Sequence, residues 1–136
     1  PDFKCTKEIK MEEGLPDINV VHQDIVRVII NLLNNAFYAV HERAKIKSDS
    51  HFEPGVKIQT GFVNSKVELR IADNGNGIPE EIRNKIFQPF FTTKPTNLGT
   101  GLGLSISYEI MKAHGGNLVL ESTSDKGTVF VLSLPV

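Results

Sequence analysis

Apolar and polar residues alternate in several stretches of the chain, and this pattern is typical of β-strands with one buried face. The first stretch covers residues 3–11, where Phe3, Cys5 and Ile9 share one side. A shorter apolar stretch at 18–21 follows a turn and is predicted to be a second strand. The remaining stretches form two pairs, each joined by a short polar turn, and predict two hairpins: 56–63 with 66–72, and 117–123 with 128–134.

Helical spacing dominates the middle of the chain. Residues 23 to about 47 carry apolar side chains every three or four positions, which predicts one long helix with a buried stripe of Ile25, Ile29, Leu32, Leu33, Ala36, Val40 and Ala44. Pro79 and the acidic residues after it predict a short helix at 80–86. A further helix is expected from 104 to about 114, where a pair of glycines ends it.

These elements predict a two-layer α/β (α+β) sandwich. Paired strands near both ends of the chain, with helices between them, indicate one mixed sheet that is covered by helices on one face. Residues 87–103 have no sustained period and contain several Gly and Pro, which predicts a loop long enough to carry a function. A length of 136 residues fits one domain, and the chain begins at Pro1 without Met, so we expect residues 1–136 to be a single domain from a longer protein.

Charge and composition exclude several classes of function. Lys and Arg number 15 against 16 Asp and Glu, giving a net charge of −1 without a basic cluster, so no nucleic-acid partner is expected. The apolar stretch at 25–40 is interrupted by Arg27 and several Asn, so we expect no insertion of this domain into a membrane. The single cysteine, Cys5, cannot form an internal disulfide, which favours a cytoplasmic location.

The segment NLLNNA at 31–36 places two amides on one face of the long helix. Asn31 and Asn35 are four residues apart, so they lie about 6 Å apart along the helix axis. Tyr38 and Glu42 continue the same face. Asn is a poor residue for the interior of a helix, so this face is either a solvent-exposed polar stripe or a binding surface.

Two glycine-rich segments could hold a ligand. DNGNGIP at 73–79 follows a predicted strand, and its Gly75 and Gly77 allow close approach to a planar group beside the Asp73 carboxylate. GTGLGLS at 99–105 precedes a helix, whose N-terminal amides attract phosphate. Each segment also has an ordinary interpretation, an Asn-Gly turn for the first and a flexible linker for the second. Neither is an EF-hand loop, a dinucleotide fingerprint or a P-loop.

Taken together, the motifs resemble the ATP-binding catalytic domain of sensor histidine kinases. That domain has the Bergerat ATP-binding fold and belongs to the GHKL superfamily, with type II topoisomerases and mismatch-repair ATPases. NLLNNA is similar to the asparagine box of that family, DNGNGIP to its first glycine box, IFQPFFTTK at 86–94 to its phenylalanine box and GTGLGLS to its second glycine box. The ending GTVFVLSLP at 127–135 resembles the closing strand, and FFTTKP resembles the nitrogen-regulation subtype.

The resemblance implies that the chain binds ATP and Mg²⁺. Asn35 is then the Mg²⁺ ligand through its amide oxygen, and the Asp73 carboxylate accepts the adenine amino group. The resemblance also implies that the base pocket is formed by Gly75, Gly77, Ile78 and Thr128. The phosphates would be held by the segment of Thr100, Gly101, Leu102, Gly103 and Leu104. Phe87 and Phe90 would tether the lid.

The chain departs from the family pattern at two places. Many members carry Lys three residues after the metal-binding Asn, where this chain has Tyr38, which is expected to pack beside the nucleotide. The missing phosphate contact would then come from Lys94 in the lid or from Arg43. His41 is followed by Glu42 and Arg43 but not by the Pro of the family's phosphoacceptor box, so we expect His41 to be a surface residue and not the phosphoacceptor.

Asn31 bears on the type of reaction. ATPases of the superfamily carry a general-base Glu at this position, whereas an amide cannot take a proton from water at neutral pH. Asn31 therefore favours a histidine kinase, which moves the γ-phosphoryl group of ATP to a His on a separate dimerisation domain. Asn31 and Lys94 are the predicted catalytic residues. The resemblance implies onward transfer to the receiver domain of a response regulator. The alternatives are an anti-sigma-type serine kinase, which would need a carboxylate at 31, and a nucleotide-binding regulatory module without catalysis.

Overall fold

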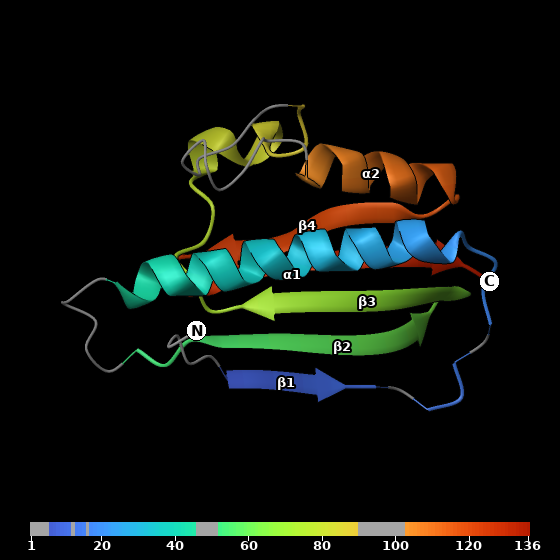
Figure 1. Cartoon of the computed structure of the whole chain (residues 1–136), viewed down its shortest axis with the longest axis horizontal. Coiled ribbons are helices and arrows are strands. Elements are labelled where there is room, and N and C mark those ends of the chain that lie inside the picture. Colours follow the sequence, from blue (N-terminus) through green and yellow to red (C-terminus); the bar gives the residue numbers. More distant parts are fainter. Residues whose placement is uncertain (1–5, 12, 16, 46–51, 90–102) are drawn as a thin grey trace.

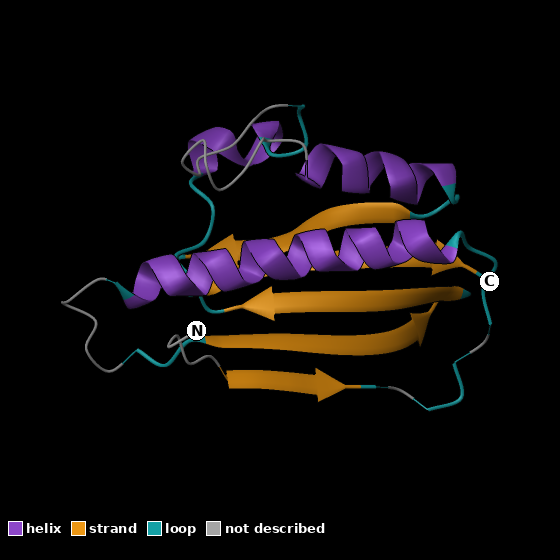
Figure 2. Cartoon of the chain, viewed as in Figure 1, coloured by secondary structure: helices purple, strands orange, loops and turns teal. Residues whose placement is uncertain are grey.

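The structure is a computed structural model that describes residues 6–11, 13–15, 17–45, 52–89 and 103–136. These residues form a five-stranded sheet with the strand order β1-β2-β3-β5-β4, and two α-helices lie over one face of it (Figures 1 and 2). The elements in chain order are β1 (Thr6–Lys10), α1 (His22–Ala44), β2 (Gly55–Val63), β3 (Lys66–Asp73), the 3-10 helix η1 (Glu80–Lys85), α2 (Gly103–Ala113), β4 (Asn117–Ser124) and β5 (Gly127–Pro135).

The sheet is mixed, as predicted. β1 pairs with β2 in parallel, while the β2–β3, β3–β5 and β4–β5 pairs are antiparallel. The hairpin of β2 and β3 turns at Asn64 and Ser65, whose φ angles of 53° and 61° are those that a two-residue type I′ turn requires. The two-layer sandwich with helices on one face is therefore confirmed. Among the described helices, none is both long and apolar enough to cross a bilayer.

The core lies between the sheet and the helices. Side chains that alternate along the strands are buried under the helices: Val56, Ile71, Leu118, Phe130, Leu132 and Leu134. α2 adds Met111, and α1 adds a row at i, i+4 spacing, Val28, Leu32, Ala36 and Val40. Because this row fixes the buried face of α1, the neighbouring polar row of the same helix is held at the margin of the core.

Two predicted elements differ from the structure. Residues 18–21 do not form a strand: Ile18 and Val20 pack against the core, but this segment has no strand partner, and Val21 is the N-cap of α1. The alternation there reflects side-chain packing rather than strand pairing. The short helix after Pro79 exists but is a 3-10 helix. Cys5 and residues 90–102, most of the predicted loop, lie outside the described residues.

Candidate functional site

A row of four residues at i, i+4 spacing runs along α1 beside its buried face: Asn31, Asn35, Ala39 and Arg43. At its first residue, the Asn31 amide nitrogen donates to Ser107 Oγ at 3.2 Å and to the Gly103 carbonyl oxygen at 3.5 Å. Gly103 and Ser107 lie at the start of α2. The row therefore begins at the N-terminal end of α2.

The other end of the row contacts the segment that follows β3. A Cβ atom placed on Gly75 would lie 2.8 Å from the Cβ atom of Ala39 and 2.9 Å from its carbonyl carbon, so only glycine fits there. Arg43 Nη1 lies 3.0 Å from the Asn74 carbonyl oxygen and 3.2 Å from that of Gly75. The close approach that Gly75 allows is thus an approach of the backbone to α1.

Asn35 lies between these two ends. It is one helical turn, about 6 Å, from both Asn31 and Ala39. Its side chain is partly buried. A ligand bound against Asn35 would therefore have the N-terminal end of α2 on one side and the glycine-rich segment on the other.

Asp73 is the last residue of β3, and its side chain is partly buried on the helix-covered face, because it alternates with buried Ile71. Its carboxylate accepts the backbone N–H of Gly75 at 2.9 Å and the backbone N–H of Thr128, its register partner on β5. Burial raises the pKa of Asp73 to about 6, although the two N–H groups act in the opposite direction. The structure therefore holds a partly desolvated hydrogen-bond acceptor at the mouth of the glycine-rich segment.

The rest of this segment is fixed against the β4–β5 hairpin. Gly77 has a φ of +81°, and a Cβ atom there would lie 1.9 Å from the Ser124 carbonyl oxygen, so no other residue fits. The Ile78 N–H donates to Thr123 Oγ1 at 2.8 Å, and that hydroxyl lies 2.9 Å from the Thr128 hydroxyl. Thr128, which is buried, thus supports the segment through Thr123 as well as through Asp73.

Gly127 and Thr123 contact the candidate site, and the sequence interpretation missed both. Gly127 has a φ of +137°, and a Cβ atom on it would lie 1.9 Å from the Asp73 carbonyl oxygen. Its position as the glycine just before the last predicted strand could have indicated a backbone that only glycine adopts. Thr123 carried no comparable local signal, because only the pairing of β4 with β5 brings its hydroxyl beside Thr128.

The structure also bears on the departures from the family pattern. Arg43 lies about 18 Å along the helix axis from Asn31, and its guanidinium contacts the backbone carbonyls of Asn74 and Gly75, so these contacts disfavour Arg43 as the source of the missing phosphate contact. The Tyr38 hydroxyl donates to a Glu42 carboxylate oxygen at 3.4 Å. His41 is partly buried on α1 rather than fully exposed.

Aromatic packing anchors the segment after η1. The Phe87 ring centroid lies 5.3 Å from that of Tyr108 and 6.3 Å from that of Phe130. Leu104, in the first turn of α2, packs against the same core. The remaining predicted lid and phosphate residues lie outside the described residues and stay predictions: Phe90, Lys94, Thr100, Gly101 and Leu102.

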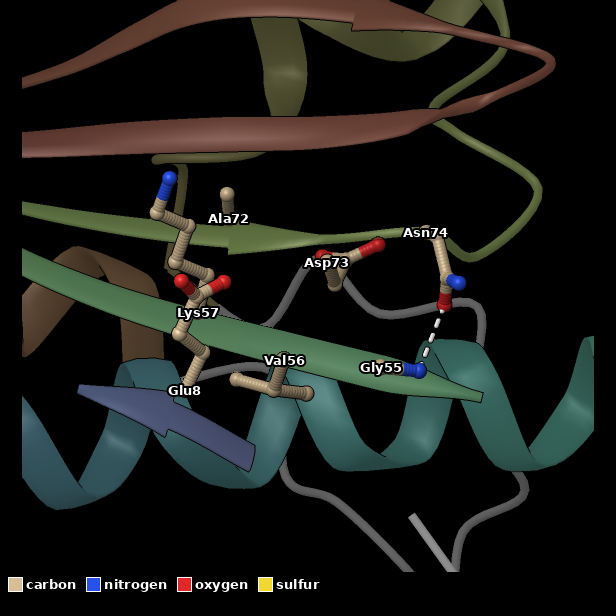
Figure 3. A pocket seen from close by; sticks show the side chains of 7 residues that line it. All are labelled: Glu8, Gly55, Val56, Lys57, Ala72, Asp73 and Asn74. Carbon is tan, nitrogen blue, oxygen red and sulfur yellow. Dashed lines mark hydrogen bonds between the residues drawn. The ribbon is translucent and has the colours of Figure 1, made fainter. Parts of the chain in front are cut away.

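A hollow of about 230 Å³ lies where the start of β2 and the end of β3 meet the middle of β1 (Figure 3). Its side walls include Glu8, Lys57 and Ala72, which are register partners across these strands. Their strand neighbours Val56 and Ile71 are buried under the helices, so the three side chains point to the uncovered face of the sheet. The hollow also reaches Asp73 and Asn74 at the end of β3, while its Glu8, Lys57 and Ala72 walls lie on the face of the sheet opposite Asn35.

Sequence comparison places the chain among known proteins. The family described as "Histidine kinase-, DNA gyrase B-, and HSP90-like ATPase" matches residues 21–136. The chain is 38% identical to the signal transduction histidine-protein kinase AtoS of Escherichia coli (strain K12), over 93% of this chain and 19% of that protein. It is 33% identical to the sensory histidine kinase/phosphatase NtrB of Rhizobium meliloti (strain 1021), over 93% of this chain and 35% of that protein. The chain thus spans between about a fifth and a third of these relatives.

Solved structures agree with this assignment. The nucleotide-free catalytic domain of histidine kinase ThkA has a TM-score of 0.78 and 33% identity to this chain, covering 96% of it and 78% of the ThkA chain. Full-length ShkA in complex with AMPPNP also has a TM-score of 0.78, with 23% identity over 96% of this chain and 25% of ShkA, and shares the fold. The chain therefore belongs to the histidine kinase-, DNA gyrase B-, and HSP90-like ATPase family and has the fold of histidine kinase catalytic domains.

Proposed function

We propose that this chain is the catalytic domain of a two-component sensor kinase, one domain of a longer protein. It binds ATP with Mg²⁺ and transfers the γ-phosphoryl group to a His on a separate dimerisation domain, from which the phosphoryl group passes to the receiver domain of a response regulator. The observation that carries the proposal is the row on α1, which sets Asn35 between the N-terminal end of α2 and the segment that holds Asp73.

Asp73 is suited to recognise the adenine base. A carboxylate accepts the exocyclic amino group of adenine but repels the carbonyl oxygen that guanine carries at the same position. The two backbone N–H bonds from Gly75 and Thr128 fix the orientation of this carboxylate. Gly77 and Ile78 continue the wall of the base pocket.

The start of α2 is suited to hold phosphates. The first N–H groups of a helix have no partner within it and attract negative charge. Among the described residues outside its own helix, the nearest atom that a Cβ on Gly103 would meet is Asn31 Cγ, at 4.0 Å, so no described side chain crowds this backbone. The neighbouring residues Thr100, Gly101, Leu102 and Leu104 complete this part of the proposal.

Asn35 supplies the kind of ligand that Mg²⁺ prefers, an amide oxygen, and needs only one protein contact if the phosphates provide the others. The bound ion would neutralise charge on the transferring group. Lys94 would add a positive charge from the lid, with Phe87 and Phe90 as tethers. Tyr38 would pack beside the nucleotide.

Asn31 supports phosphoryl transfer to a His rather than rapid hydrolysis. Its amide nitrogen is hydrogen-bonded to α2, and an amide cannot accept a proton from water at neutral pH. An imidazole nitrogen already carries a lone pair, so its attack needs no such base. The same absence of a carboxylate disfavours a serine kinase.

Calorimetric titration of the chain with a non-hydrolysable ATP analogue, with and without Mg²⁺, tests the binding part of the proposal. Binding that strengthens with Mg²⁺ is expected, and no binding under either condition would contradict it. Incubation with ATP and the dimerisation domain of the same protein then tests the reaction. Phosphohistidine on the added domain is expected, whereas a regulatory module without catalysis would bind ATP and label nothing.

A further inference from the structure

Arg43 makes an unusual set of contacts at the end of the row on α1. Its Nη1 atom lies within 3.0 to 3.2 Å of three backbone carbonyl oxygens, those of Asn74, Gly75 and Asp125. The guanidinium carbon also lies 4.5 Å from the centre of the Phe52 ring. One side chain thus joins α1 to the segment before β2, the glycine-rich segment and the β4–β5 turn.

The contact with Asn74 has a specific geometric consequence. The Asn74 carbonyl and the Gly75 N–H belong to one planar trans peptide group, so they point in opposite directions. The carbonyl oxygen of this group lies 3.0 Å from Arg43 Nη1, and its N–H donates to the Asp73 carboxylate at 2.9 Å. A charge-assisted bond at one side of the peptide therefore fixes and polarises the donor at the other side.

The orientation of the Asn74–Gly75 peptide depends on such a contact. Gly75 has the widest choice of backbone conformations of any residue type, so the peptide before it can rotate at low cost when its carbonyl is released. The Asn74 side chain holds the start of β2, through Gly55 N–H and the Glu53 carbonyl, each at 2.8 Å, and does not hold the peptide itself.

We propose that Arg43 is a positioning residue for base recognition, which acts by holding the Asn74–Gly75 peptide so that its N–H orients the Asp73 carboxylate. This inference rests on the proposed function, because it takes the base to be adenine at Asp73. Arg43 does not touch the nucleotide. It sets the preference for adenine over guanine through the backbone.

The test compares Arg43→Met, Arg43→Lys and Arg70→Met in the 136-residue chain. Met keeps the length of the side chain but has no N–H donor, while Lys keeps the charge and its donors. Arg70 is the matched control, because it pairs with Glu68 and Glu121 on the uncovered face of the sheet, away from Asp73. A merely structural arginine would lower the melting temperature without changing base preference.

Calorimetry with non-hydrolysable ATP and GTP analogues gives the first readout. Arg43→Met is expected to weaken the binding of the ATP analogue about tenfold and to change the affinity for the GTP analogue by no more than about twofold. Arg43→Lys is expected to restore most of the preference for the ATP analogue over the GTP analogue. Arg70→Met is expected to keep the wild-type ratio of the affinities for the ATP and GTP analogues. An Arg43→Met protein that is folded and keeps the wild-type ratio would overturn the inference.

The second readout needs no nucleotide. The Gly75 N–H lowers the pKa of Asp73, so loss of its orientation in Arg43→Met should raise the pKa of the Asp73 carboxyl group, measured by NMR on the ligand-free protein. Arg70→Met should leave it unchanged. If the wild-type chain binds neither analogue, the proposed function fails, and the Asp73 pKa alone then decides whether Arg43 positions the carboxylate.

Discussion

The two ends of the row on α1 are built differently. At the Arg43 end, three backbone carbonyls face one guanidinium nitrogen, and two glycines leave no room for a Cβ atom. At the Asn31 end, one amide makes bonds of 3.2 and 3.5 Å to α2, and among the described residues a Cβ atom on Gly103 would meet only Asn31 Cγ, at 4.0 Å. In the proposed function, base recognition would therefore be preorganised, whereas the end proposed to hold the phosphates is less tightly built.

Glycine substitution gives the largest expected contrast between the ends. Gly77→Ala should lower the free energy of unfolding by about 3 kcal/mol or more, because it combines a positive φ with a backbone clash. Gly103→Ala should change it by less than about 1 kcal/mol, because Ala is favoured in helices and no described residue comes closer to its Cβ atom than ordinary contact distance. Urea unfolding of both variants measures the difference. Equal losses at the two positions would remove the basis of the comparison.

Asn35→Ala tests the middle of the row. Removal of the amide oxygen should weaken Mg²⁺-dependent binding of an ATP analogue by about 10- to 100-fold, equivalent to about 1.4 to 2.7 kcal/mol, while the melting temperature stays close to that of the wild type. Asn34→Ala is the matched control, because the neighbouring Asn34 is exposed. Calorimetry with and without Mg²⁺ provides the measurement. Unchanged affinity under both conditions would remove Asn35 from the proposed metal site.

Asp73 makes the preorganised end dependent on pH. Its pKa is raised in the folded state from 3.8 to about 6, so the folded protein binds more protons than the unfolded chain between these values. The free energy of unfolding should therefore fall as the pH rises from about 4 to about 6, by about 2 kcal/mol after allowance for partial exposure. Asp73→Asn should lack this part of the pH dependence.

Urea unfolding at several pH values, without nucleotide, measures this contribution as the difference between the two proteins, since other carboxylates titrate equally in both. Superimposable pH profiles would show that the Asp73 carboxylate is not desolvated as the fold implies. The same variant should also lose discrimination between ATP and GTP analogues, because an amide can donate to guanine.

The smallest effect is expected at the Asn31 end. Asn31→Ala and Ser107→Ala should each cost about 1 kcal/mol of folding free energy, and a double-mutant cycle should give a coupling of about 0.5 to 1 kcal/mol. This range corresponds to the one bond of ordinary length between the two side chains. A coupling several times larger would show that this end is as firmly built as the other.

Much of the fold could be predicted from the sequence because periodicity is a local property. The two hairpins and both α-helices follow from spacings of two and of three or four residues. The predicted strand at 18–21 failed because Ile18 and Val20 satisfy the same alternation by packing on the core without a strand partner. Local patterns identify a buried face but not the element that covers it.

The candidate site could be predicted only where its residues are close in sequence. Asn31 and Asn35 share a helix, so their common face was evident. The sequence left the role of Arg43 open, because its carbonyl partners belong to segments that meet α1 only through the tertiary fold. The restriction on Gly75 is also non-local, since Ala39 is what excludes a side chain there.

The pairing of β3 with β5 has a consequence for the order of folding. Asp73 meets Thr128 and Gly127 only after η1, α2 and β4 have been placed between them. Closing such a long loop is entropically costly, so contacts of this separation form slowly and late. A nascent chain that lacks its last strand can form the helix with both Asn residues but lacks the end proposed to recognise the base. Nucleotide binding would therefore mark the completion of folding, and nucleotide would stabilise only chains whose C-terminal hairpin has docked.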